Sequence, residues 1–279
     1  MKSAFQKILL FAMVLIMVIT TSCNCEKKTE QHQKREIKFQ LGVASYSLRK
    51  FSLDTTLAFT KQLGVDKIAF KSFHLKLDAT DAEIAETVQK CKEAGIDLYA
   101  GGVIYMKTEA EVDQAFEYAR KAGMKMIVGV PGHELLSYVE KKVKEYDIKL
   151  AIHNHGPGDK LYPSAESAYV LIKNMDPRMG LCIDIGHTMR IQRSPSQDVK
   201  DFFDRVLDIH IKDVTKADSD GSTCEIGRGV IDFKAFLNDL IDMGYSGVLA
   251  LEFEKDGDNP FPGMGESMGY VRGMLTAIQ

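Results

Sequence analysis

From Leu41 onward, hydrophobic and polar residues alternate between two kinds of sequence pattern, one typical of strands and one typical of helices. Short apolar runs of strand character precede longer stretches in which apolar positions recur with the period of an amphipathic helix. Each strand with its helix takes about 30 residues, which predicts parallel strands joined by helical crossovers. The eight apolar runs are LGVASY (41–46), DKIAFK (66–71), IDLYA (96–100), KMIVGV (125–130), IKLAIH (148–153), GLCIDI (180–185), VLDIHI (206–211) and GVLALE (247–252).

Helix boundary signals agree with this division. Thr80 and Thr108 each stand three residues before a glutamate, which predicts a capping box at two helix starts. Four glycines end helical stretches just before a strand, as left-handed C-caps do: Gly64, Gly95, Gly123 and Gly244. Eight such units in about 240 residues predict a single (β/α)8 TIM barrel. A doubly wound open sheet is the alternative, although no GxGxxG follows the first strand.

Alternation within the strands separates two faces. In a barrel strand, one set of side chains packs against helices and the other points to the axis. In the fifth run, for example, Ile152 is expected outward and His153 inward. The inward faces of the strands carry polar residues at their C-terminal ends: Lys71, His153, His155, Asp184, His210, Glu252 and Glu254. We therefore expect these side chains around one mouth of the barrel, where TIM-barrel enzymes place their chemistry.

The remaining polar residues near strand ends carry weaker signals. His187 follows the sixth strand by two residues, and His74 and Lys212 also fall near the rim. Each could contact a substrate or only face solvent. Asp213 and Asp232 are predicted to be turn or helix-start residues rather than catalytic ones.

The donor types at strands five to eight point to metal chemistry. Carboxylates and imidazoles together suit a divalent ion such as Mn, Mg, Co, Fe or Zn. Such an ion would bind the carbonyl and a neighbouring hydroxyl of a sugar, and would stabilise the enediolate formed when the adjacent C–H proton is removed. The sequence contains no P-loop, no GxSxG elbow and no CxxC pair that would indicate different chemistry.

Four motifs in this order resemble the xylose-isomerase-like barrels, the sugar-phosphate isomerase/epimerase group that also includes endonuclease IV. They are IDIGH (183–187), IHIKD (209–213), GRGVIDF (227–233) and LALE (249–252). The resemblance covers the chain from Leu41 to its C-terminus. It implies the TIM-barrel fold and says little about the substrate.

The resemblance also implies a ligand set. It makes Asp184, His210 and Glu252 metal ligands, and it places the fourth ligand at His153. In the family this fourth position is usually a glutamate at the end of strand five, and the epimerases use it with a strand-eight glutamate as two acid/base groups. Histidine at this position departs from that pattern, although imidazole can coordinate a metal or act as a base near neutral pH.

Further roles follow from the same resemblance. His187 matches a position that often binds a substrate oxygen, and Lys71 stands where many members carry an acidic residue. A lysine there would bind a substrate oxygen or stabilise an oxyanion. The candidate catalytic residues are thus His153, Glu252, Lys71 and His187. The candidate substrate-binding residues are His74, His155, Lys212 and Glu254.

The sequence favours a metal-dependent sugar isomerase or epimerase that abstracts a proton next to a carbonyl. A lyase or hydratase that performs β-elimination on a keto-sugar or 3-keto-glycoside is the alternative, and a non-catalytic carbohydrate-binding protein is a further one. A phosphodiesterase resembling endonuclease IV would need more metal ligands. The net charge of −3 and the pI near 6.2 also argue against a nucleic-acid partner.

The N-terminus indicates export. The apolar run 8–19 follows two lysines and is too short to span a bilayer, as in a signal peptide. The sequence TTSC (20–23) resembles a lipobox, so we expect a signal peptide over 1–22, a lipidated Cys23, a flexible tether over 23–38 and the barrel over 39–279. The predicted protein is a periplasmic or surface lipoprotein, attached to the membrane only through its anchor. The sequence leaves its oligomeric state open.

Overall fold

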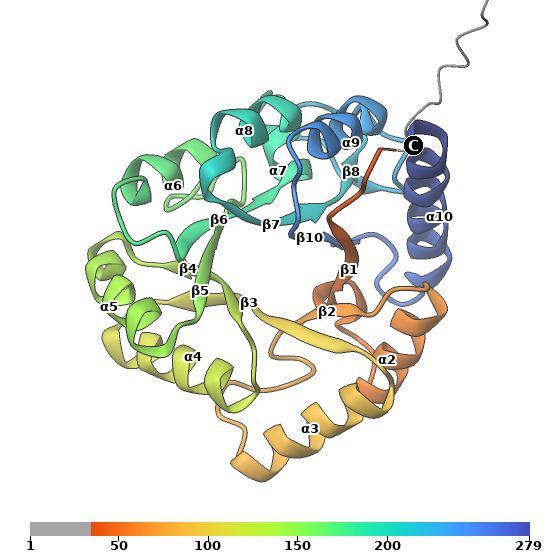
Figure 1. Cartoon of the computed structure of the whole chain (residues 1–279). Coiled ribbons are helices and arrows are strands. Elements are labelled where there is room, and N and C mark those ends of the chain that lie inside the picture. Colours follow the sequence, from red (N-terminus) through yellow and green to blue (C-terminus); the bar gives the residue numbers. More distant parts are fainter. Residues whose placement is uncertain (1–34) are drawn as a thin grey trace, which may run out of the picture. The chain divides into compact units, whose positions relative to one another are not determined.

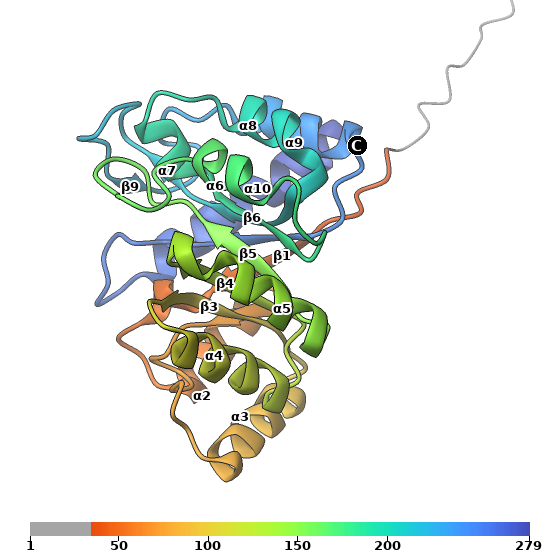
Figure 2. The same ribbon diagram turned by 90° about the vertical axis from the view of Figure 1, so that its left-hand side faces the viewer.

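A computed structural model describes residues 35–279, which form a closed barrel of eight strands with helices outside it (Figure 1). The predicted signal peptide, Cys23 and most of the predicted tether lie outside the described residues. Around the barrel the strand order is β1-β10-β7-β6-β5-β4-β3-β2. Figure 2 shows the same ribbon from the side, with the helices around the strands.

The barrel strands agree with the eight predicted apolar runs. They are β1 (Gln40–Ala44), β2 (Lys67–Phe70), β3 (Asp97–Met106), β4 (Met126–Pro131), β5 (Lys149–His153), β6 (Met179–Asp184), β7 (Val206–Ile211) and β10 (Val248–Leu251). Every neighbouring pair is parallel, and the pairing of Gln40 with Val248 closes the ring between β1 and β10. The TIM-barrel prediction is confirmed, and the open-sheet alternative is wrong.

Helices follow the strands and cover the outside of the barrel. They are α2 (Leu53–Gln62), α3 (Asp81–Glu93), α4 (Glu109–Lys121), α5 (Leu136–Tyr146), α6 (Ala165–Ile172), α7 (Ile185–Arg190), α8 (Pro195–Asp201), α9 (Phe233–Asp242) and α10 (Phe261–Ile278). None of the helices in the described part of the chain has the length and apolarity needed to cross a membrane.

The predicted helix boundaries are largely confirmed. At α3, the Thr80 hydroxyl accepts from the backbone N–H of Glu83, whose carboxylate accepts from the backbone N–H of Thr80, so the capping box is complete. At α4, Thr108 accepts from the N–H of Glu111, but the Glu111 carboxylate accepts from Lys107 instead. The four predicted C-cap glycines all have the left-handed backbone expected of them, with φ between 63° and 71°.

Two features differ from the expected pattern. Strand β3 continues to Met106 rather than ending at residue 100, and its register against β4 shifts between Gly101 and Ile104. The loop after β7 contains a short antiparallel ribbon of β8 (Asp213–Val214) and β9 (Thr223–Cys224). Its strands are too short to produce an alternation of apolar and polar residues, so the pattern does not predict them.

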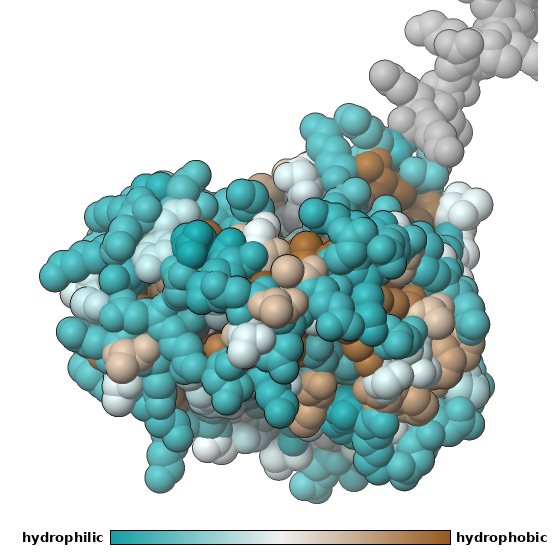
Figure 3. All heavy atoms as spheres, turned by 90° about the horizontal axis from the view of Figure 1, so that it is seen from below, coloured by the Kyte–Doolittle hydropathy of each residue, from teal (hydrophilic) through white to brown (hydrophobic). Residues whose placement is uncertain are grey.

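The core lies between the strands and the helices. Outward strand residues such as Ile68 and Leu150 are fully buried, and so are Leu237 and Leu240 of α9. Cys91 and Cys182 are buried free thiols. One face of the molecule, seen in Figure 3, is mainly hydrophilic with scattered apolar residues. Arg35 already bonds to Asn238 of α9, so packing begins just before the predicted domain start.

Candidate active site

A cavity of about 270 Å³ opens at the C-terminal ends of the strands. This end collects the polar side chains because the inward positions that end each strand all face the same mouth. The cavity brings together six of the predicted site residues with three that were not predicted: Lys71, His153, His155, His187, Glu252 and Glu254, and Tyr46, Val103 and Tyr105.

The four predicted metal ligands converge beside this cavity, and two of them, His153 and Glu252, line it. His153, Asp184 and His210 end β5, β6 and β7, and Glu252 follows β10 directly. These strands are neighbours in the barrel, and each residue occupies an inward position. One donor atom from each lies within 4.8 Å of all the others, and all four side chains are buried.

The spacing of the donor atoms fits a divalent ion. His153 Nε2 lies 3.1 Å from His210 Nδ1 and 3.7 Å from the Asp184 Oδ2 atom. His210 Nδ1 lies 3.4 Å from Glu252 Oε2. Ligands at about 2.1 Å from an ion lie roughly 3.0 Å apart in an octahedron and 3.4 Å apart in a tetrahedron. Asp184 Oδ2 is buried without a hydrogen bond and is paired with the Lys212 ammonium at 3.1 Å, so it is an ionised oxygen facing the other donors.

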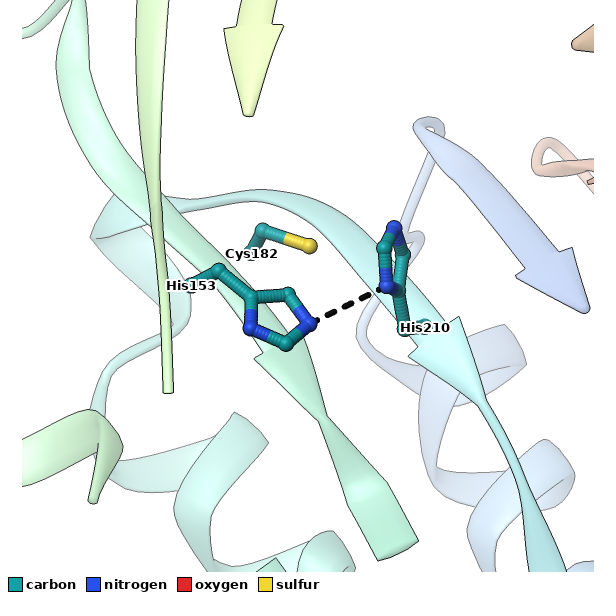
Figure 4. Close-up of side chains that lie close together, drawn as sticks. All are labelled: His153, Cys182 and His210. Atoms are coloured by element: carbon teal, nitrogen blue, oxygen red, sulfur yellow. Dashed lines mark hydrogen bonds between the residues drawn. The ribbon is translucent and has the colours of Figure 1, made fainter. Parts of the chain in front are cut away.

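Figure 4 shows the two imidazoles pointing toward each other, with Cys182 beside them. Cys182 is a second possible partner for His153 and His210. Its thiol donates to Asp208 Oδ2 at 3.9 Å. The group with Asp184 and Glu252 supplies four donors, whereas the group with Cys182 supplies three, so the carboxylates make the more complete ligand set.

Lys212 balances the charge of the carboxylates. Its ammonium lies 3.1 Å from Asp184 Oδ2, 3.0 Å from Glu252 Oε2 and 3.0 Å from Glu254 Oε2. Burial lowers the pKa of Lys212, but these carboxylates outweigh burial and raise it well above the usual value. Lys212 is therefore a fixed buried cation. It does not line the 270 Å³ cavity.

The ligand side chains titrate differently because their neighbours differ. Burial, together with His210, lowers the pKa of His153 well below its usual value, which favours the neutral imidazole. Burial also opposes the charged form of His210, but the Glu252 carboxylate raises its pKa overall. Against the effect of burial, Lys212 and His210 hold the pKa of Glu252 well below its usual value.

His187 is oriented by two contacts. Its backbone N–H donates to Asp184 Oδ1 at 2.8 Å, which caps α7, and its Nδ1 accepts from an Arg190 nitrogen at 3.3 Å. Arginine only donates hydrogen bonds, so Nδ1 is unprotonated and the proton of the neutral ring lies on Nε2. Burial, then the charge of Lys212, lowers the pKa of His187 to about 3. His187 is thus a neutral donor at the cavity.

The cavity lining also includes Lys71, Tyr105 and His155. The rings of Tyr105 and His155 are stacked with centroids 5.6 Å apart, and the Tyr105 hydroxyl lies 3.1 Å from His155 Nε2. Burial lowers the pKa of His155, which keeps it neutral near pH 7. Lys71 donates to the carbonyl of Val103, and burial lowers its pKa as well.

Comparison with known proteins is consistent with this geometry. Residues 57–274 match the Xylose isomerase-like TIM barrel family. The chain belongs to this family. The predicted resemblance is thereby confirmed at the level of family and fold, whereas the roles of the site residues stay predictions.

The individual proteins that the chain resembles have low sequence identity to it. An inosose dehydratase of Salmonella typhimurium is 30% identical over a segment covering 44% of this chain and 46% of that protein. The chain thus spans about half the length of the curated relatives it matches first. A putative uncharacterized protein from Parabacteroides distasonis is 28% identical, with a TM-score of 0.67 over 85% of this chain and 99% of that one.

An L-ribulose 3-epimerase has a TM-score of 0.71 over 86% of this chain and 95% of that one. At 16% identity, this likeness shows the fold alone.

One predicted substrate-binding residue, His74, and the two aspartates predicted to be structural lie away from the cavity. His74 is buried, and its ring nitrogens contact the hydroxyls of Ser45 at 3.0 Å and Thr56 at 2.9 Å. The structure does not bring it to the cavity. Asp213 accepts from backbone N–H groups of the GRGVIDF loop, and Asp232 caps α9, so both have the structural roles expected of them.

Several side chains that support the site were not predicted. The Asn154 amide oxygen accepts from the backbone N–H of Asp184 at 2.9 Å, which joins the ends of β5 and β6. Below His210 on β7, Asp208 accepts a hydrogen bond from the Tyr99 hydroxyl at 3.0 Å. The inward parity of β7 places Asp208 at the axis, but nothing in the sequence identifies Tyr99 as its partner.

Proposed function

We propose that this chain is a divalent-metal-dependent enzyme that removes a proton next to the carbonyl of a sugar or cyclic polyol ketone, and then eliminates water or an alkoxide from the neighbouring carbon. The observation that carries the proposal is the buried set of His153, Asp184, His210 and Glu252, whose spacing fits an ion and which opens on a small polar cavity. His153 and Glu252 belong to both the ligand set and the cavity wall.

A divalent ion held by these four residues would polarise the substrate carbonyl and stabilise the negative charge of the enediolate. The chain itself supplies two further donors at the same cavity, the Lys71 ammonium and the His187 Nε2–H. Both are fixed by other contacts, so they can bind substrate oxygens without reorganising.

We assign the two proton transfers to His155, which lines the cavity and lies outside the ligand set. Its neutral imidazole takes the proton as the C–H bond breaks, and the electron pair of that bond moves into the enediolate. The imidazolium then donates this proton to the leaving oxygen as the C–O bond at the next carbon breaks, so water or an alcohol departs. Glu254 lines the same cavity and can accept a hydrogen bond from a substrate hydroxyl. Lys212 and His210 hold the pKa of Glu252 below its usual value, so we assign Glu252 to the ligand set rather than to proton transfer.

Two observations favour elimination over epimerisation. His153 occupies the position of one of the two glutamates that flank the sugar in the resembling epimerases. The Salmonella relative is an inosose dehydratase, which is named for the loss of water. Isomerisation or epimerisation is the second candidate. It also begins with removal of the proton next to the carbonyl. Glu252 stands at the position of the strand-eight glutamate that serves as an acid/base group in the resembling epimerases.

The test follows proton exchange and product together. The purified protein is stripped of metal, reloaded with Mn, Co, Mg or Zn, and incubated in D₂O with inosose, a ketose or a 3-keto-glucoside. We expect deuterium next to the carbonyl by NMR and an enone absorbing in the ultraviolet. A new ketose or epimer would instead support the second candidate. A protein that binds no divalent ion and needs none would support the non-catalytic carbohydrate-binding alternative.

Variants test the assigned ligands. We expect Asp184→Asn and His210→Ala to lower metal content and turnover together, by about 100-fold or more in turnover. Metal content is measured by elemental analysis after gel filtration. Full metal-dependent turnover in either variant would show that the ion is bound elsewhere.

We also propose, from the N-terminal sequence, that the protein is an exported lipoprotein anchored through Cys23. Cys23→Ser is expected to move the protein from the membrane fraction to the soluble exported fraction, and the mass of its N-terminal peptide should lack the lipid. A variant that stays in the membrane fraction would contradict the anchor.

A further inference from the structure

A second cavity of about 500 Å³ adjoins the first. His187 and Glu254 line both cavities, so they stand at the boundary. The second cavity lies between α7, the loop that carries β8 and β9, and the segment after β10. Its further lining includes Arg190, Lys212, Thr215, Ser222, Thr223 and Lys255. Apart from His187, Lys212 and Glu254, the residues that line this cavity have no role in the proposed reaction.

The charges that face the second cavity leave one cation unbalanced. Lys212 is paired with Asp184, Glu252 and Glu254, and Lys255 lies 2.8 Å from a Glu225 oxygen. Arg190 has no carboxylate within 4.0 Å among residues 35–279. Its guanidinium is held by the Ser219 carbonyl at 3.0 Å and by His187. These two contacts fix its position and leave its positive charge uncompensated.

We propose that the second cavity binds an anionic group of the substrate, a carboxylate, sulfate or phosphate, through Arg190. The planar guanidinium pairs well with oxyanions. The hydroxyls of Thr215 and Ser222 share one hydrogen bond at 3.3 Å, so one of the two keeps a proton for a remaining anion oxygen. Loops after the seventh and eighth strands of TIM barrels frequently bind phosphate, and these loops form part of this cavity. The identity of the reacting ring rests on the proposed function, but anion binding does not.

A neutral second sugar is disfavoured by the lining. Proteins commonly hold a sugar ring against an aromatic face, and the described residues that line this cavity include no Phe, Tyr or Trp. His187 links the anion to the reaction. Its Nδ1 faces Arg190, so an anion bound to Arg190 would lie one side chain away from the reacting ring.

The test compares ligands that share one ring. Calorimetry measures binding of D-glucose, D-glucuronate, D-glucose 6-sulfate, D-glucose 6-phosphate and cellobiose, together with inorganic sulfate and phosphate. We expect at least one charged sugar to bind about tenfold or more tightly than glucose, with the preference shrinking at high salt. The charged sugar with the largest preference identifies the anion class.

Variants assign the preference to Arg190. Arg190→Gln should abolish the preference for charged sugars. Arg190→Lys should retain part of this preference, because lysine keeps the charge but lacks the two parallel N–H donors of the guanidinium. The matched control is Arg228→Gln, because Arg228 is exposed, pairs with Glu266 and does not line the cavity. This variant loses the same charge and should keep the full preference. Circular dichroism checks the fold of each variant.

Three results would overturn the proposal: equal or absent binding of charged and neutral sugars by the unaltered protein, a charge preference that survives Arg190→Gln, or cellobiose binding that exceeds that of every charged sugar. Binding requires no turnover, so a failure here is separable from a failure of the elimination assay. Loss of proton exchange with an intact charge preference would refute only the proposed function.

Discussion

In the proposed ligand set, His153 would set the ion preference, because it places an imidazole where the resembling family members carry a carboxylate. Imidazole favours Zn, Co and Fe, whereas carboxylates favour Mg and Mn. His153 is buried, and burial favours the neutral ring, which is the form that coordinates a metal. In the proposed site, His153 would therefore determine which ions bind well, whichever substrate is used.

Restoring the carboxylate should shift that preference. We expect His153→Glu to raise the affinity for Mg or Mn relative to Zn by about tenfold or more, measured by competition calorimetry on metal-free protein. His155→Gln is the control, since His155 lies next to the ligand set but outside it. An unchanged Mg-to-Zn ratio in His153→Glu would show that His153 is not a ligand.

At the scale of elements, strand parity made most of the site predictable. The side-chain period of a strand is two, so an inward His153 or Asp184 follows once its outward neighbours are assigned. Tyr105 was not predictable, because β3 runs on beyond two glycines that read as its end. Cavity residues supplied by the β8–β9 ribbon, such as Thr223, were missed because strands of two residues leave no periodic signal.

Strand β7 also carries a buried charge beneath the site. Burial raises the pKa of Asp208 to about 6, and one of its oxygens has no partner. A carboxyl group with a raised folded-state pKa contributes full stability below its unfolded pKa, near 4, and loses that stability as pH rises through about 6. At pH 8 the buried carboxylate is therefore a cost.

Asp208→Asn should remove that cost. We expect its free energy of unfolding to exceed that of the unaltered protein by about 1–3 kcal/mol at pH 8, with the difference disappearing toward pH 4. Urea unfolding of metal-free protein measures both. Asp78→Asn, at an exposed position, should show no such difference. A variant that is less stable at pH 8 would mean that Asp208 is stabilised by its surroundings rather than strained.

At the scale of the whole molecule, the sequence identified the barrel and its family because eight repeats leave a strong periodic signal. It could not identify the second cavity, which depends on how three loops distant in sequence meet. The position of Lys212 was equally hidden. The sequence places Lys212 near the rim of the barrel. In the structure its side chain turns inward to three carboxylates, which come from two other strand ends.

Lys212→Gln tests how far the whole fold depends on this cation. Without the ammonium, Asp184, Glu252 and Glu254 face one another uncompensated, so the metal-free protein should lose about 3–5 kcal/mol of unfolding free energy at neutral pH. Added Zn or Mn should recover much of the loss, as followed by thermal unfolding. Lys50→Gln, which removes an exposed pair with Asp258, should cost under about 1 kcal/mol. Equal losses in the two variants would contradict the role of Lys212.

The Lys212 ammonium among the carboxylates bears on the order in which the protein folds and binds an ion. Acidic ligands that face one another repel, so a site built from them ordinarily depends on a bound ion to hold it together. In this chain the Lys212 ammonium supplies the opposing charge. Under the proposed function, the barrel would therefore fold before the ion binds, and the folded protein would lose one ion and bind another without refolding.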